Sequence, residues 1–127
     1  MKIPIRSLIA AAALLILTAS VGAHHGVAVY DSSRTITFMG TVSEYHFANP
    51  HTIIYVDVKD RNGTVEKWQG ELTSPNSLER LGWSNHSLKM GDQITVTGHP
   101  ARTGAKSTWV TKVILPGGRE LEADTEN

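Results

Sequence analysis

Apolar and polar residues alternate along short segments of the chain, and this two-residue period limits it to a β-sheet fold. In Thr35–Val42, the side chains of Ile36, Phe38 and Val42 fall on one face and threonines fall on the other, as in a half-buried strand. Four later segments also read as strands: Thr52–Val58, Thr64–Leu72, Gln93–Gly98 and Thr108–Leu115. With 127 residues in all, the chain has room for one small all-β domain.

One short helical segment interrupts the strands and suggests how they are arranged. Ser74-Pro75 is typical of a helix cap followed by proline at the first helical position, and Gly82 is placed to end the helix. Three strands, a helix near residues 75–81 and two strands form the order of the OB barrel. The segment Leu88–Gly98 also resembles the start of the fourth strand in many OB domains. We therefore expect a five-stranded OB-like β-barrel with one short helix; a small sandwich is the competing fold.

Two irregularities are expected in the first half of the barrel. Gly40 stands where the alternation calls for a side chain, which indicates a bend or a close backbone approach. Tyr45 and Phe47 are out of phase with Val42, so a β-bulge is expected near Ser43-Glu44.

The N-terminal segment has the pattern of a secretory signal peptide. Lys2 and Arg6 precede an unbroken apolar run from Leu8 to Leu17, which is too short to span a bilayer. Val21 and Ala23 occupy the two positions that signal peptidase reads, which predicts cleavage after Ala23. We expect a soluble, periplasmic or secreted product without a membrane anchor.

Cleavage at that point defines four regions. They are a signal peptide at residues 1–23, an N-terminal arm at 24–34, the barrel at 35–122 and a disordered tail at 123–127. The chain has no cysteine, which excludes disulfides, zinc–thiolate sites, iron–sulfur clusters and a cysteine nucleophile. Loss of Lys2 and Arg6 leaves a small net negative charge, which argues against a nucleic-acid partner. We expect a monomer.

Histidines are the side chains of this sequence best suited to bind a metal ion, and two of them would begin the mature chain. After cleavage, His24 would offer its free amine and its ring nitrogen to one metal ion, a bite that suits square-planar copper(II). His25 follows directly and could add a second ring. A mobile polar arm whose histidines bind nothing is the alternative interpretation.

His51 is the third candidate metal ligand. It follows Asn49-Pro50, a stiff pair that holds it at the start of a strand. The eleven-residue arm can cross a domain of this size at about 3.3 Å per residue, so His24 can reach His51. Capping of the turn by hydrogen bonding is the alternative role for His51. His46 lies across the same turn as a weaker candidate, and we expect His86 and His99 on the surface.

Evidence for other chemistry is weak. The chain has no Gly-x-Ser-x-Gly, no phosphate-binding glycine loop and no His-Glu-x-x-His. Trp68 and Glu71 are candidates for lining a pocket, although a carboxylate at a strand end is more often solvated. Trp83 and Trp109, like Trp68, are expected to fill the core and ends of the barrel.

The whole mature chain also resembles a family of small exported bacterial proteins of unknown function. The resemblance lies in an ordered set of motifs: His24-His25-Gly26, Gly40-Thr41-Val42, Phe47-Ala48-Asn49-Pro50-His51, Ser74-Pro75-Asn76 with Leu78, Arg80, Gly82 and Trp83, then Gly91-Asp92 and His99-Pro100. Phe47 stands where we expect tryptophan. The resemblance implies a site around the His-His start and the Asn-Pro-His turn, and it points to no known activity.

Three hypotheses of function follow. The first is a periplasmic metal-binding module, for copper(II), with His24, His25 and His51 as ligands. The second is an OB-type module that binds a small ligand or another envelope protein without metal. The third is a copper-dependent oxidase, which ranks last because the sequence shows neither an open coordination position nor a substrate surface.

Overall fold

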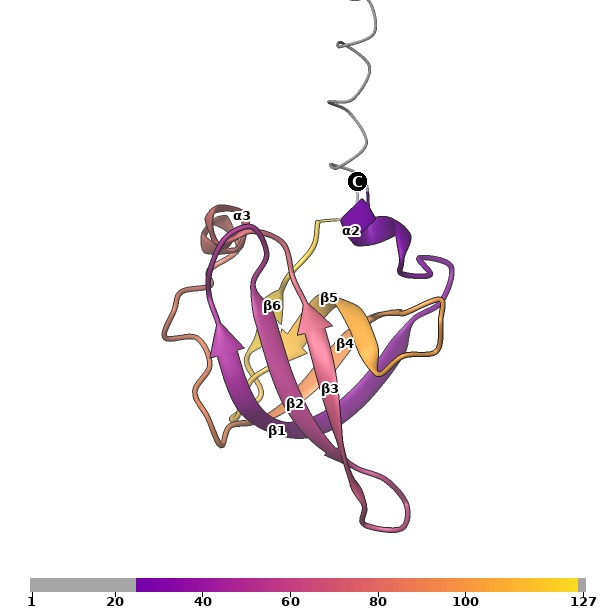
Figure 1. Ribbon diagram of the computed structural model, residues 1–127. Helices are drawn as coiled ribbons and strands as arrows, with labels where there is room; N and C mark the ends of the chain where they lie inside the picture. The colour runs from indigo at the N-terminus through magenta and orange to yellow at the C-terminus, as the bar shows by residue number, and fades with distance from the viewer. Residues whose placement is uncertain (1–24, 126–127) are drawn as a thin grey trace, which may run out of the picture.

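The computed structural model describes residues 25–125, which form a barrel with an N-terminal arm on its outer wall (Figure 1). Two short helices and six strands are described: α2 (His25–Ala28), β1 (Ile36–His46), β2 (Ile53–Lys59), β3 (Val65–Glu71), α3 (Pro75–Arg80), β4 (Gln93–Pro100), β5 (Ser107–Ile114) and β6 (Glu120–Glu122). The predicted signal peptide and His24 lie outside the described residues.

Strands β1 to β5 close into a barrel. The hydrogen-bonded order is β3-β2-β1-β4-β5, and a short parallel pairing of β3 with β5 joins the two ends. This closing seam pairs Gln69 with Ser107, Gly70 with Thr108 and Glu71 with Trp109. The predicted five-stranded OB-like barrel is therefore confirmed, and two separate packed sheets are excluded. The three-residue strand β6 adds to the outer edge of β5 and was not predicted.

The two expected irregularities of β1 are present. The register of β1 against β2 shifts between Val42 and Glu44, which confirms the bulge. A Cβ on Gly40 would lie 2.5 Å from Cγ1 of Val56 and 2.6 Å from the carbonyl oxygen of Asp57. Glycine is therefore needed here because β1 passes close to β2 as it bends from one partner strand to the other.

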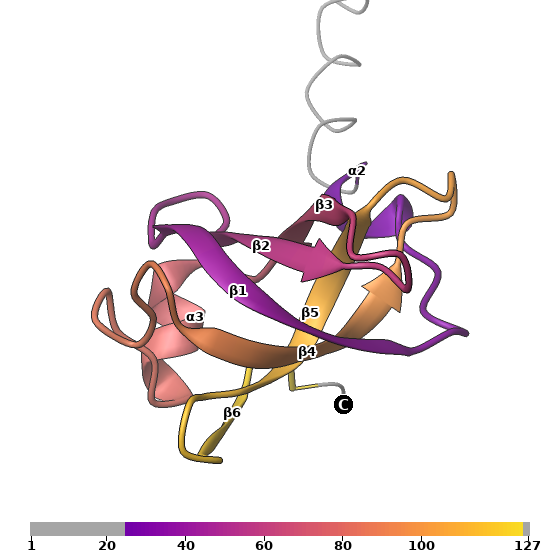
Figure 2. The same ribbon diagram turned by 90° about the horizontal axis from the view of Figure 1, so that it is seen from below.

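The helix α3 covers one end of the barrel, as Figure 2 shows from below. Ser74 caps the helix by accepting a hydrogen bond from the backbone N–H of Ser77, and Pro75 occupies its first turn, as predicted. Leu78 and Trp83 are buried in the main core. Besides these two, the core contains Val42, Ile54, Val56, Leu72, Leu88, Ile94, Val96, Val110, Val113, Leu121 and Ala123.

The start of the expected disordered tail is packed against the barrel. Ala123 is fully buried, and its N–H donates to the carbonyl of Thr111. Asp124 accepts a hydrogen bond of 2.7 Å from Nε1 of Trp109. Ala123 and Asp124 are therefore packed on the barrel and do not belong to a disordered tail. They lie there because β6 brings the chain back along β5.

The N-terminal arm follows the end of β4 and the loop after it. Tyr30 forms an isolated antiparallel bridge with Ala101. The N–H of Asp31 donates to the carbonyl of Pro100, and the N–H of Arg102 donates to the carbonyl of Val29, both at 2.9 Å. These contacts fix α2 close to the end of the barrel where β3 stops (Figures 1 and 2). Across residues 25–125, no helix has the length and apolarity needed to cross a membrane.

Candidate functional site

The candidate site lies on the outer face of the seam between β3 and β5. A Cβ on Gly70 would point into the barrel, 2.8 Å from Val110. Because side chains alternate along a strand, Glu71 on β3 and Trp109 on β5 point outward. Trp109 packs with Tyr30 and Ala101 in an apolar cluster separate from the main core. The arm therefore covers this part of the outer wall.

Glu71 is at the centre of a hydrogen-bonded cluster. Its Oε1 lies 2.5 Å from Nδ1 of His51, and its Oε2 accepts a bond of 2.6 Å from the hydroxyl of Tyr30. The Tyr30 hydroxyl is also 3.1 Å from Oγ of Ser107. One carboxylate thus joins the entrance of β2, the end of β3 and the N-terminal arm. We call His51, Glu71, Tyr30 and Ser107 the seam cluster.

The contact with Glu71 determines which nitrogen of His51 can bind a ligand. A carboxylate only accepts hydrogen bonds, so Nδ1 of His51 carries the proton and the neutral ring keeps its lone pair on Nε2. The side chain of His51 is 34% exposed, compared with 16% for Glu71. Histidines that bind metals commonly donate their other ring N–H to a carboxylate in this way, which fixes the ring and increases the basicity of the ligand nitrogen.

Tyr30 remains a hydrogen-bond donor over the whole physiological range. Burial, followed by the hydrogen bond to Glu71, raises the pKa of Tyr30 to about 12. Ionising this phenol would remove the proton that it donates and would place a second negative charge beside the carboxylate. The bond between Tyr30 and Glu71 is therefore stable at neutral and at moderately alkaline pH.

Trp109 forms the apolar wall of the seam cluster. Its ring meets His51 edge to face with centroids 5.6 Å apart, and it meets Tyr30 at 6.1 Å. The hydrogen bond from its Nε1 to Asp124 also restrains the Trp109 ring. These contacts limit rotation of the His51 ring, in addition to the restraint from Glu71.

The structure brings together two of the residues singled out in the sequence, namely His51 and Glu71. The helix α2 begins at His25, but the structure does not describe the side chain of this residue, and His24 lies outside the described range. His46 lies 2.8 Å from Glu44 through its Nε2 on the exposed face of β1. The ring of Trp68 packs on Phe38 at 4.7 Å and on the main core, so it faces the other side of the barrel wall from Glu71.

The two histidines expected on the surface differ. His86 is exposed, as predicted. His99 is only 8% exposed, and its Nδ1 lies 2.7 Å from the carbonyl oxygen of Arg34. The surface expectation for His99 was wrong because the N-terminal arm crosses the end of β4 and covers it.

Tyr30 and Ser107 were not predicted from the sequence, and Trp109 was expected only to fill the core and ends of the barrel; it is buried, in the cluster with Tyr30 and Ala101. The one available signal was Tyr30 itself, the one aromatic residue of the arm, which follows Val27-Ala28-Val29. Its partners could not be inferred, because Glu71 and Ser107 are 41 and 77 residues away along the chain.

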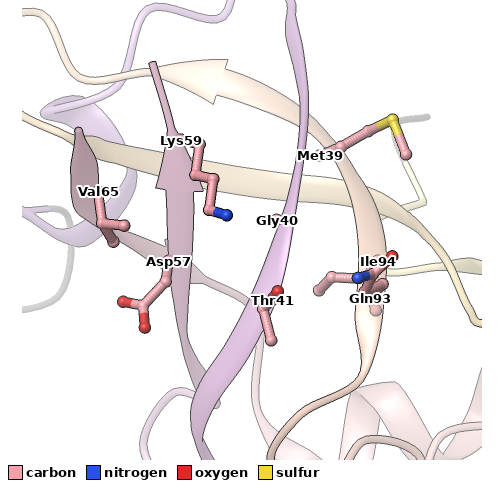
Figure 3. A pocket seen from close by; sticks show the side chains of 8 residues that line it. All are labelled: Met39, Gly40, Thr41, Asp57, Lys59, Val65, Gln93 and Ile94. Carbon is pink, nitrogen blue, oxygen red and sulfur yellow. The ribbon is translucent and has the colours of Figure 1, made fainter. Parts of the chain in front are cut away.

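A second feature of the surface is a depression of about 500 Å³ between β1, β2, β4 and the start of β3 (Figure 3). Its apolar part includes the side chains of Met39 and Val65, which are 70% and 54% exposed. Lys59 extends across it from β2 toward Gly40 on β1, as Figure 3 shows. The remaining lining residues are Thr41, Asp57, Gln93 and Ile94.

A family model matches the greater part of the chain. The match covers residues 12–110 and belongs to DUF6152, a family of unknown function. The chain is a member of this family. The expected resemblance to an uncharacterised family is thereby confirmed. Among curated proteins, no match to the chain is found.

Proposed function

We propose that this member of DUF6152 is an exported copper(II)-binding module whose ligands are His24, His25 and His51. The observation that carries the proposal is the hydrogen bond between Nδ1 of His51 and Glu71, which leaves the lone pair of a partly exposed imidazole on Nε2. Among residues 25–125, no three side chains of the metal-binding types gather into a site. The proposal therefore takes its other nitrogen ligands from the start of the mature arm.

The path of the arm supports this assignment. Tyr30 holds the arm against the same carboxylate that contacts His51. His24 lies six residues before Tyr30, and an extended chain of that length reaches about 20 Å. The turn of helix at His25–Ala28 shortens this reach. We therefore propose that the mature N-terminus reaches His51.

The proposed donor set suits copper(II). One amine and two or three imidazole nitrogens form the nitrogen-rich, tetragonal environment that this ion prefers. The free amine has a pKa of about 8, so metal binding at neutral pH must displace its proton. Affinity should therefore decrease as the pH falls below neutrality, because the amine and the imidazoles then keep their protons.

The test compares the authentic mature protein with a version that has one extra residue before His24. The extra residue separates the free amine from the His24 ring and leaves every barrel contact in place. We expect copper(II) affinity, measured by calorimetry at pH 7, to decrease at least about tenfold. His51→Ala should also weaken binding, whereas His86→Ala, at an exposed loop histidine, should not. Equal affinity in the extended and authentic proteins would reject the N-terminal chelate.

The depression on β1, β2 and β4 favours a second function, the binding of a small apolar anion. Lys67 neutralises Asp57 at 3.6 Å, whereas no carboxylate within residues 25–125 forms an ion pair with Lys59. One uncompensated ammonium group therefore lies beside exposed Met39 and Val65. This combination suits a ligand with one negative charge and an apolar body.

A fluorescent apolar sulfonate, 8-anilinonaphthalene-1-sulfonate, is the probe for this second function. We expect binding with a blue-shifted emission and several-fold weaker affinity in Lys59→Gln. Arg119→Gln removes one positive charge from an exposed turn elsewhere and serves as the matched control. If both variants bind the dye as wild type does, the depression is not its site.

A further inference from the structure

We propose that Tyr30 is a positioning residue that couples docking of the N-terminal arm to the metal-ligating orientation of His51. This inference rests on the proposed copper site and adds to it a link between two parts of the chain. The link is Glu71, whose two carboxylate oxygens hold the Tyr30 hydroxyl and Nδ1 of His51 separately. If either partner moves, the Glu71 carboxylate moves with it, and its contact with the other partner changes.

The hydroxyl of Tyr30 is not needed for the packing of its ring. The ring lies against Trp109 and Ala101, and phenylalanine would keep these apolar contacts. The hydroxyl adds a bond to a charged acceptor, which is stronger than a bond to a neutral one. Because Tyr30 itself is only 5% exposed, solvent screens this bond weakly. Tyr30→Phe therefore removes the coupling group and keeps the apolar contacts of the ring, so the arm is docked less firmly but is not released.

Coupling of this kind is reciprocal. A docked arm holds Glu71 against His51, and this contact keeps the lone pair of the neutral ring on Nε2. A metal ion that bridges His51 and the N-terminus holds the arm against the seam in return. The arm should thus be more firmly docked in the metal-bound protein, and the metal should be bound more tightly when the arm is docked.

The experiment uses authentic mature wild type, Tyr30→Phe and Tyr45→Phe. Tyr45→Phe removes a phenol hydroxyl that donates to the carbonyl of Ser84 outside the seam cluster, so it serves as the matched control. We expect copper(II) affinity to decrease several-fold in Tyr30→Phe, because Tyr30 acts through Glu71, and removal of the direct partner of a metal ligand typically costs about tenfold or more. Tyr45→Phe should remain within about twofold of wild type.

Electron paramagnetic resonance of the copper(II) protein separates positioning from general stability. In Tyr30→Phe, the nitrogen hyperfine pattern should lose the contribution of one imidazole, as it does in His51→Ala. A merely structural role for Tyr30 would lower the stability without changing the spectrum. Far-UV circular dichroism of the metal-free variants verifies that the barrel is folded.

Hydrogen exchange provides a readout that needs no metal. The amides of Asp31 and Arg102 bond across the interface between the arm and the barrel, so they should exchange faster in Tyr30→Phe than in wild type. Copper binding and spectra that are identical in wild type and Tyr30→Phe would overturn the coupling alone. Wild-type protein that binds no copper would overturn the proposed function and the coupling with it.

Discussion

Asp92 illustrates how single residues hold the barrel, because it fixes the turn that leads into β4. Its carboxylate accepts bonds from Nζ and from the backbone N–H of Lys89, at 2.7 and 3.0 Å. A backbone hydrogen bond joins this turn to β1, since the N–H of Val42 donates to the carbonyl of Asp92. The hydrogen bond from the Lys89 side chain is the main cause that lowers the pKa of Asp92.

The lowered pKa of Asp92 predicts a specific acid sensitivity. A carboxyl group with a lower pKa in the folded state stabilises the fold above about pH 4, and this contribution disappears as the pH falls. Asp92→Asn should therefore reduce the free energy of unfolding at pH 7 by about 1 kcal/mol. The variant and the wild type should become more similar near pH 3. Urea unfolding at both pH values measures this, and an equal difference at the two pH values would contradict it.

At the residue scale, the sequence identified chemical types but not their contacts. His51 and Glu71 stood out as a histidine on a stiff turn and a carboxylate at a strand end. Their pairing depends on the register of β2 and β3, in which Ile53 lies opposite Glu71. Tyr30 joins this pair only because the arm turns back over the seam, and no local pattern encodes that path.

Among the elements, α3 is the one whose boundaries depend most on local chemistry. Ser74 accepts from the N–H of Ser77, and Gly82 has a φ of +93° just after the helix. Both are standard helix-end signals, so the predicted segment agrees with the observed helix. The alternating strands were equally visible, because each of them buries one face.

The Ser74 cap gives a prediction for the helix element. Ser74→Ala removes the side-chain acceptor at the start of α3 and should destabilise the protein by about 1 kcal/mol. Ser74→Asp keeps an acceptor at the same position and should remain close to wild type. Thermal unfolding of the three proteins measures both effects. A loss of the same size in both variants would mean that the hydroxyl acts in some way other than as a cap.

The elements that the sequence did not reveal are the shortest ones. A three-residue strand such as β6 is too short to show a two-residue period, and its partner β5 supplies half of its definition. The burial of Ala123 follows from the same pairing. The helix α2 is a single turn in the arm, and four residues carry no helical period.

For the whole molecule, the copper proposal predicts a change in thermal stability with a definite origin. The His24 chelate exists in the unfolded chain as well, so it contributes little to the difference between the two states. His51 is brought to the arm only by folding, and its share of the affinity therefore stabilises the native state. If that share is a hundredfold, saturating copper adds about 2.7 kcal/mol, a rise of roughly 10 °C in a domain of this size.

Scanning calorimetry of the authentic mature protein, with and without copper(II), measures this rise. His51→Ala should bind the metal through its amino end and yet show almost no rise in melting temperature. Metal-free His51→Ala should melt at a lower temperature than wild type, because it loses the hydrogen bond to Glu71, so the rise caused by copper is measured within each protein. An equal rise in both proteins would place the stabilising ligand somewhere other than His51.

The docking of the arm on the seam also sets the order in which parts of the chain fold during its synthesis. Tyr30 is made early, but its partners Ala101 and Ser107 lie more than 70 residues further along the chain. Closing so long a loop is costly until the strands that carry the far end have paired. The first part of the described chain is thus the last to settle. Any enzyme that trims the amino end before synthesis is complete meets a free segment and not a docked one.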